Sequence, residues 1–182
     1  LVDQIASQLA SIPRGPVTRN ESPSAVRAAM GLNGGLPEEG TDAATLLATT
    51  ATHLFEHSLF NAHPRFLGYI TSSAAPIGIL GDLLASALNP NVGAWILSPA
   101  ASEIEAQTIR WIAELTGYPT DCGGILVSGG NMANFVCFLA ARAARAGWDI
   151  RRDGVAGSPR QLVAYASPET HTWIQKAADL AG

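Results

Sequence analysis

The sequence predicts an α/β fold in which helices cover a parallel sheet. Two short apolar segments, Ile125 to Val127 and Gln161 to Ala166, have the character of buried strands, and each precedes an amphipathic helical pattern. A strand, helix, strand, helix order is typical of parallel sheets, because the crossover helix returns the chain to the edge where the next strand starts. The 182 residues are 47% hydrophobic and only 14% charged, so the chain can bury a sizeable core.

Residues 1 to 60 are predicted to form a helical arm. A first amphipathic helix ends at Pro13, and a stretch rich in proline and glycine follows as far as residue 40. Asp42 then caps a helix that runs to His57. An extended stretch such as Pro13 to Gly40 rarely stabilises itself, so we expect it to lie across another surface, within the subunit or on a partner.

Two helices are predicted between this arm and the first strand. Pro76 opens one of them, since proline is favoured in the first turn, and Asn89 ends it. The other begins at Ser98 or at Ser102, because Ser102 and Glu105 fit the pattern of a capping box. Its apolar positions recur at helical spacing and are expected to be buried. They are Ile104, Thr108, Trp111, Ile112 and Leu115.

The Ser128-Gly129-Gly130-Asn131 turn lies between the first strand and its helix. Glycine has no side chain to obstruct a ligand and tolerates positive φ, so the backbone can approach a bound group closely. The helix that follows begins with unpaired N–H groups and the positive end of its dipole, which together hold an anion. A glycine pair before a helix also serves as an ordinary strand-to-helix connection, but we favour a phosphate site.

His171 follows the second strand and is expected at the start of the last helix. Ligands of parallel sheets bind outside the carboxyl ends of the strands, which is where His171 and the turn both fall. Taken alone, a histidine in this place would be a surface or capping residue. Its position beside the phosphate site favours a functional role.

Composition excludes several classes of protein. The net charge is −4 and the arginines are scattered, so nucleic acid is not an expected partner. No apolar run is long enough to span a bilayer and no signal-peptide pattern is seen, so we expect no membrane association and a cytoplasmic location. Cys122 and Cys137 are expected to be buried free thiols rather than a disulfide.

Lysine and histidine are scarce in this chain. Lys176 is the single lysine, beside ten arginines. A reaction that needs a lysine must therefore use Lys176 or a lysine from outside this chain. His53 and His57 share a helix face at a spacing that could bind a metal, but the sequence suggests no third ligand. We therefore predict packed or solvated histidines and no metal site. His63, beside Pro64, is predicted to anchor a loop rather than to act as a base.

Four sequence blocks, in order and spacing, resemble the group II pyridoxal-phosphate-dependent amino-acid decarboxylases. This family includes the aromatic-L-amino-acid and glutamate decarboxylases, and the second block is more similar to the aromatic branch. The resemblance runs from about Leu36 to Gly182. The blocks are His63 to Tyr69, Trp95 with Ser98 to Glu105, Ser128 to Asn134, and Ser167 to Thr172.

The resemblance implies a fold and a set of site residues. It implies the aspartate-aminotransferase-like fold (fold type I), with residues 61–182 as the first, incomplete part of the large cofactor-binding domain and the arm as a contact of a homodimer. The cofactor would be pyridoxal 5'-phosphate (PLP). The implied roles are phosphate binding by Gly129, Gly130 and Asn131, ring stacking and catalysis by His171, and substrate binding by Tyr69, Ile70 and Ser72.

The implied reaction is decarboxylation of an L-amino acid through an external aldimine, with an aromatic substrate favoured over glutamate. An aldehyde synthase or lyase on the same scaffold is an alternative, as is a non-catalytic phosphate-binding or nucleotide-binding module, for which Glu169 would have to bind a ribose. In the family, the lysine that binds the cofactor lies well beyond the histidine block, and Lys176 does not match it. We therefore expect a C-terminal part of the enzyme to complete the site.

Overall fold

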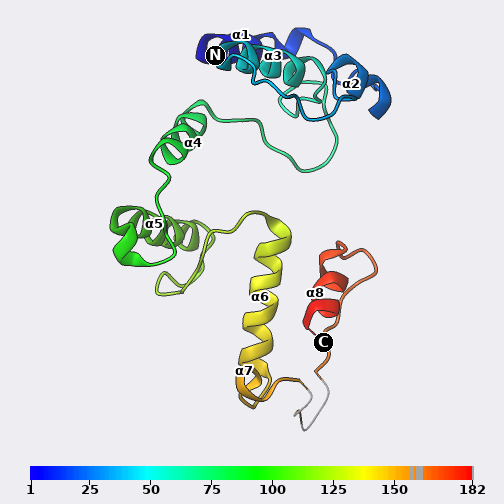
Figure 1. Ribbon diagram of the computed structural model, residues 1–182. Helices are drawn as coiled ribbons and strands as arrows, with labels where there is room; N and C mark the ends of the chain where they lie inside the picture. The colour runs from blue at the N-terminus through cyan, green and yellow to red at the C-terminus, as the bar shows by residue number, and fades with distance from the viewer. Residues whose placement is uncertain (156–157, 159–161, 182) are drawn as a thin grey trace. The chain divides into compact units, whose positions relative to one another are not determined.

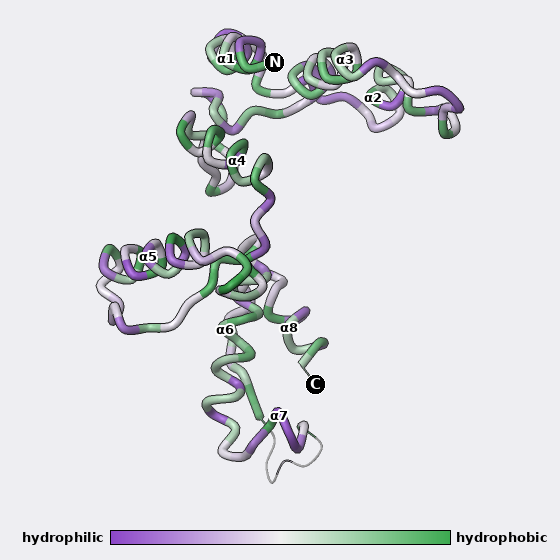
Figure 2. Tube along the Cα trace, turned by 60° about the vertical axis from the view of Figure 1, so that its left-hand side comes forward, coloured by the Kyte–Doolittle hydropathy of each residue, from purple (hydrophilic) through white to green (hydrophobic). Residues whose placement is uncertain are grey.

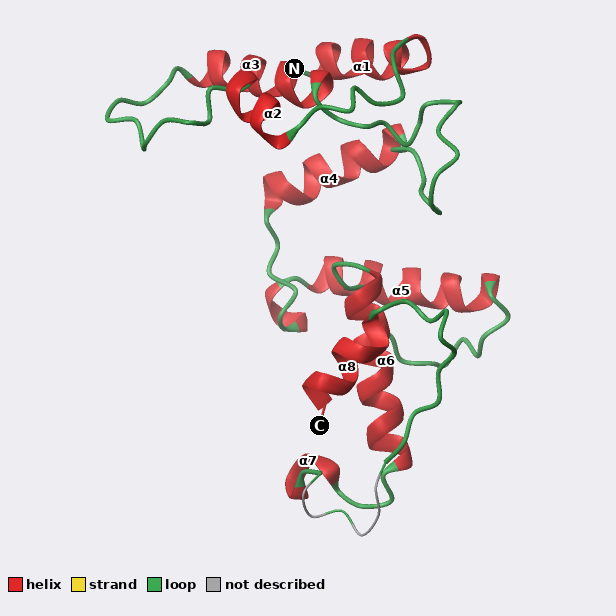
Figure 3. Ribbon diagram, turned by 90° about the vertical axis from the view of Figure 1, so that its right-hand side faces the viewer, coloured by secondary structure: helices red, strands yellow, loops and turns green. Residues whose placement is uncertain are grey.

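The computed structural model describes residues 1–155, 158 and 162–181, and all regular structure in these ranges is helical (Figures 1 and 3). The chain divides into two units, Leu1–Asn89 and Pro90–Gly182, each described here by itself. The predicted domain boundary after residue 60 stays a prediction. The first unit contains α1 (Val2–Ser11), the 3-10 helix η1 (Ile12–Arg14), α2 (Pro23–Ala29), α3 (Ala43–Glu56) and α4 (Pro76–Leu88); the second contains the 3-10 helix η2 (Trp95–Leu97), α5 (Pro99–Leu115), α6 (Gly130–Arg145), α7 (Ile150–Asp153) and α8 (Trp173–Ala181).

Local capping explains where the helices of the first unit begin. The Asp42 carboxylate accepts a hydrogen bond from the Thr45 backbone N–H at 2.9 Å and another from the Thr45 hydroxyl at 3.0 Å, which confirms the predicted cap. These bonds lower the pKa of Asp42 below its ordinary value of 3.8. Pro76 stands at the first position of α4, and Asn89 ends that helix in the left-handed conformation, at φ 45°.

His63 anchors the loop that follows α3. It is 2% exposed, and its Nε2 lies 3.1 Å from the Gly15 carbonyl oxygen. Its Nδ1 accepts a hydrogen bond from the Arg65 backbone N–H at 3.1 Å, so the bond to Gly15 is donated by Nε2–H. Both ring nitrogens are therefore used within the protein, which confirms the predicted anchoring role.

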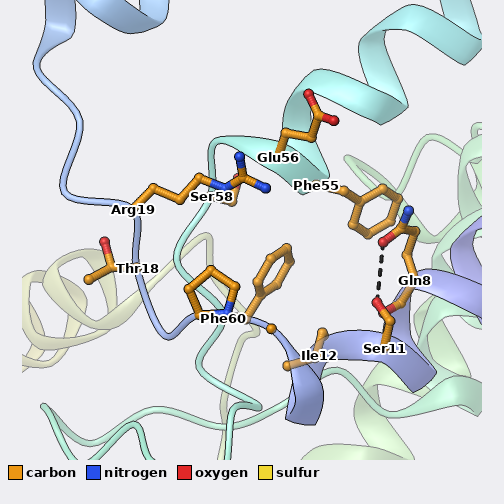
Figure 4. A pocket seen from close by; sticks show the side chains of 11 residues that line it. Gln8, Ser11, Ile12, Thr18, Arg19, Phe55, Glu56, Ser58 and Phe60 are labelled. Atoms are coloured by element: carbon orange, nitrogen blue, oxygen red, sulfur yellow. Dashed lines mark hydrogen bonds between the residues drawn. The ribbon is translucent and has the colours of Figure 1, made fainter.

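A small pocket of about 120 Å³ lies beside this loop. Figure 4 shows the rings of Phe55 and Phe60 facing it, with Glu56 extending from the last turn of α3. The two rings stack with their centroids 6.2 Å apart. Gln8 and Ser11 also line the pocket, and the Ser11 hydroxyl donates a hydrogen bond to the Gln8 side-chain oxygen at 3.3 Å.

In the second unit, α5 begins directly after Ser98, the first of the two predicted starts, and not at Ser102. Pro99 occupies its first turn and Ser102 lies inside the helix, so no capping box forms. Glu105 instead accepts a hydrogen bond from the Leu126 backbone N–H at 2.9 Å, 21 residues away. The carboxylate that local spacing assigned to a helix cap therefore holds the extended segment in front of α6.

The helices α6 and α8 of this unit pack side by side (Figure 1). The rings of Trp173 and Phe138 form a T-shaped contact, with centroids 6.5 Å apart and planes at 73°. Ala177 is 2% exposed in the same contact, and the Arg142 guanidinium donates a hydrogen bond to the Ala181 carbonyl. This packing fixes the chain that leads into α8.

The two predicted strands are not strands in the described part of the chain. Residues 125–127 and 162–166 are non-helical but join no ladder, and Gln161 lies outside the described residues. A strand needs a neighbour to satisfy its backbone groups, and these residues have none in the described structure. The chain between these two segments also contains the short helix α7, which is capped by the Asp149 side chain; residues 156, 157, 159 and 160 lie outside the described residues.

Many apolar side chains are exposed. Figure 2 shows that hydrophobic residues make up much of α4. Leu84 is 59% exposed, Leu180 75% and Trp111 58%, so the prediction of Trp111 as a core residue is wrong for this structure. Cys122 and Cys137 are free, as predicted, but neither is buried: Cys122 is half-buried and Cys137 is exposed. Among the described residues, no helix combines the length and hydropathy needed to cross a membrane.

Candidate active site

The start of α6 presents backbone N–H groups without helical partners. Gly129 is the residue before the helix and has φ 154°. A residue with a side chain would be strained in this backbone conformation, whereas glycine is not. The first helical bond runs from the Ala133 N–H to the Gly129 carbonyl, at 3.0 Å. The N–H groups of Gly130, Asn131 and Met132 therefore have no acceptor within the helix, and Gly129 has no side chain to cap them. This arrangement suits an anion.

These residues line an open hollow of about 700 Å³. A Cβ atom at Gly129 or Gly130 would meet no other atom within 4 Å, so the space in front of the turn is clear. The lining residues combine the turn with the chain that leads into α8. They are Ser128, Gly129, Gly130, Asn131, Met132, Asn134, His171 and Trp173.

His171 reaches this hollow because of the packing of α8. It lies two residues before the helix, rather than within it as the sequence suggested. Its Nδ1 accepts a hydrogen bond from the Trp173 backbone N–H at 3.3 Å, and the Trp173 ring is held against Phe138. In the neutral ring the proton is therefore on Nε2, which is left to interact with a ligand.

Lys176 lies outside the lining of this hollow. It borders an adjoining, mainly apolar groove of about 210 Å³, together with Phe135 and Leu180. That Lys176 is not the cofactor-binding lysine stays a prediction. Glu169, which a nucleotide site would require, is also not among the residues that line the hollow.

The predicted substrate residues belong to the other unit. Tyr69 and Ile70 are almost fully exposed, at 93% and 106%, and Ser72 is exposed. Tyr69 has φ +58°, which is uncommon for a residue with a side chain. Their assignment to substrate binding stays a prediction.

Sequence reasoning missed two polar or aromatic residues of the hollow, Asn134 and Trp173. The signal for Asn134 was available: it follows Asn131 by three positions, which places both side chains on one face of the first helical turn. Trp173 has the helical spacing of a core residue, so spacing alone gave no sign of a place in the site. It is half-buried, packs on Phe138 and also borders the hollow.

Comparison with known proteins identifies the class to which this fold and this turn belong. Residues 25–182 match the model of the pyridoxal-dependent decarboxylase conserved domain. The chain therefore belongs to the pyridoxal-dependent decarboxylase family, and the resemblance seen in the sequence is confirmed.

Individual relatives agree with this assignment. The chain is 33% identical over 147 residues to an aromatic-L-amino-acid decarboxylase of Bacillus atrophaeus, covering 81% of this chain and 29% of that protein. It is 31% identical over 125 residues to a phenylacetaldehyde synthase of Arabidopsis thaliana, covering 65% of this chain and 24% of that protein.

A solved structure shows the fold. The crystal structure of Oryza sativa TDC with PLP and tryptamine matches all of this chain and 38% of its own, with a TM-score of 0.82 and 29% identity. The predicted fold class is therefore confirmed. The chain spans about a quarter to two-fifths of the length of these relatives.

The described residues fit the phosphate end of PLP. Free N–H groups, clear space at two glycines and a histidine meet in one hollow. No lysine or arginine is among the lining residues, so the helix start itself supplies the positive potential for a phosphate.

Proposed function

We propose that the protein containing this chain is a PLP-dependent decarboxylase of an aromatic L-amino acid. The observation that carries the proposal is that the Ser128–Asn131 turn and His171 line the same hollow at the uncapped start of α6. Similarity to an aromatic-L-amino-acid decarboxylase over 81% of the chain supports the aromatic substrate.

Each described residue then has a definite task. The N–H groups of Gly130, Asn131 and Met132 bind the phosphate and fix the position of the cofactor, which when bound supplies an electron sink for cleavage at the substrate α-carbon. His171 restrains the cofactor ring by stacking. Its Nε2–H donates a hydrogen bond to the substrate carboxylate or provides a proton after carbon dioxide leaves.

The proposal extends to parts of the protein beyond this chain. A C-terminal part would supply the lysine that binds the cofactor and the acidic partner of its ring nitrogen. Tyr69, Ile70 and Ser72 would contact the substrate. The arm of residues 1–60 would contribute to a homodimer, and the enzyme would be cytoplasmic.

The complete polypeptide tests this function. We would incubate it with PLP and L-tryptophan, L-tyrosine, L-phenylalanine or L-glutamate, and measure carbon dioxide, amine and aldehyde. Carbon dioxide and amine from an aromatic substrate are expected. Release from L-glutamate alone would contradict the substrate class, and the absence of carbon dioxide with every amino acid would contradict the reaction.

Two substitutions test the residue assignments. His171→Ala should lower kcat by about 10²–10⁴-fold, the usual effect of losing a positioned proton donor. Lys176→Ala is the matched control on the same part of the chain and should leave kcat unchanged. Equal activity in the two variants would remove His171 from the proposed mechanism.

An aldehyde synthase is the second candidate, because the chain is also 31% identical to a phenylacetaldehyde synthase. The same product analysis separates the two functions. Aldehyde formed in place of amine would assign the protein to this candidate.

A further inference from the structure

The last turn of α3 brings together three side chains able to bind a metal. His53, Glu56 and His57 are spaced three and four residues apart, which places them on one helix face. One potential ligand atom from each lies within 4.8 Å of the other two. The histidine rings stack with centroids 5.9 Å apart. Two imidazoles and a carboxylate form a donor set that suits Zn²⁺ and similar cations.

Glu21 orients one of these imidazoles. The Nδ1 of His57 lies 2.9 Å from the Glu21 Oε2, across 36 residues of chain, and the His57 side chain is only 11% exposed. Since a carboxylate can only accept, Nδ1–H is the donor, and Nε2 of the neutral ring keeps its lone pair. Metal-ligating histidines are commonly held in this way, with the other ring nitrogen bonded to a carboxylate.

The other imidazole has a polar atom without a partner. The Nδ1 of His53 is buried and makes no hydrogen bond within the described ranges of the chain. A buried polar nitrogen left unpaired is unfavourable, and such exceptions often mark an ion or water site. The end of a helix also carries partial negative charge, which favours a cation there.

We propose that His53, Glu56 and His57 bind one divalent transition-metal ion, with Glu21 as the positioning residue of His57. Ligand atoms around a tetrahedral Zn²⁺ lie about 3.3 Å apart. The three side chains must therefore rotate to bring their ligand atoms, now within 4.8 Å of one another, to this distance. In the helical pattern His-x-x-Glu-His the two histidines bind zinc, which agrees with the placement of His53 and His57; Glu56 as a third ligand rests on its place in the cluster. The sequence alone suggested no third ligand. The structure places Glu56 beside the two histidines as that ligand, and it places Glu21 in contact with Nδ1 of the His57 ring. The site is independent of the proposed decarboxylase function.

The test is a Zn²⁺ titration of the chelator-treated chain by isothermal calorimetry, repeated with Co²⁺ and visible absorption spectroscopy. We expect one ion per chain and a Co²⁺ spectrum without the charge-transfer band of thiolate ligands. His53→Ala should weaken binding at least tenfold, and Glu21→Gln should weaken it about 10–100-fold as a positioning residue. His171→Ala is the matched histidine control and should leave the affinity unchanged.

Glu56→Gln guards against loss of folding, because Glu56 is exposed and the substitution preserves its size. This variant should keep its circular dichroism spectrum and lose at least tenfold in Zn²⁺ affinity. The proposal is overturned if the chain shows no saturable binding or if the thiolate band appears. It is also overturned if Glu56→Gln and His53→Ala bind as tightly as the parent chain.

Discussion

Gly124 holds the extended segment before the Ser128–Asn131 turn against α5. A Cβ atom at this position would lie 2.7 Å from Cγ2 of Ile109 and 3.5 Å from its Cδ1. The Cγ2 methyl belongs to a β-branched side chain with restricted χ1, so it cannot easily turn aside. Gly124→Ala therefore overpacks the contact and should lower the free energy of unfolding by about 1–3 kcal/mol.

The neighbouring glycine provides a matched control. A Cβ atom at Gly123 would meet nothing within 4 Å. Gly123→Ala should leave the free energy of unfolding unchanged or raise it by about 0.4–1 kcal/mol, because alanine restricts the unfolded chain. Urea unfolding followed by circular dichroism measures both variants, with midpoints compared at equal slope.

A double-mutant cycle identifies the clashing group. Ile109→Ala removes the Cγ2 methyl, so Gly124→Ala should cost little in that background, with a coupling of about 1 kcal/mol or more. Two results would refute the reasoning: equal unfolding of the Gly124→Ala and Gly123→Ala variants, or an unchanged cost of Gly124→Ala when Ile109 is alanine.

Two further predictions concern a helix cap and a helix contact. The hydrogen bond from the Thr45 N–H lowers the pKa of Asp42, so its stabilising effect is present above pH 3.8 and is lost as the pH falls through the lowered pKa. Asp42→Ala should therefore destabilise the chain at pH 7 but not near pH 2. Asp42→Asn is the control and should largely preserve the cap. An equal effect of Asp42→Ala at both pH values would contradict this prediction. Alanine substitutions of Phe138 and Trp173, alone and together, should show a coupling of about 0.5–1.5 kcal/mol in thermal unfolding, whereas simple additivity would mean that the two rings do not interact.

Local signals in the sequence were sufficient for most helix boundaries. Asp42, Pro76 and Asn89 act through residues at most four positions away, so their effects can be read from spacing. The Gly129–Gly130 pair likewise determines the uncapped start of α6, so the residues of the turn alone predict this part of the candidate site.

The remaining features depend on contacts between distant segments. The spacing of Glu105 is that of a capping-box residue. Its carboxylate instead accepts a hydrogen bond from the Leu126 N–H, 21 residues away. Glu21 and His57 interact although they are 36 residues apart in the chain, and no periodic pattern in the sequence predicts this contact. The two apolar segments predicted as strands would need neighbouring strands that the described chain does not provide, so periodicity alone gave the wrong element.

The central claim is that the start of α6 and His171 hold the phosphate and ring of PLP. The most direct measurement is an amide NMR titration of the chain with 4-deoxypyridoxine phosphate, which lacks the aldehyde and cannot react with Lys176. The largest shift changes should fall on the N–H groups of Gly130, Asn131 and Met132, with a change at the His171 ring. Saturable binding that shifts other residues and leaves these amides unchanged would contradict the account, as would no binding at all.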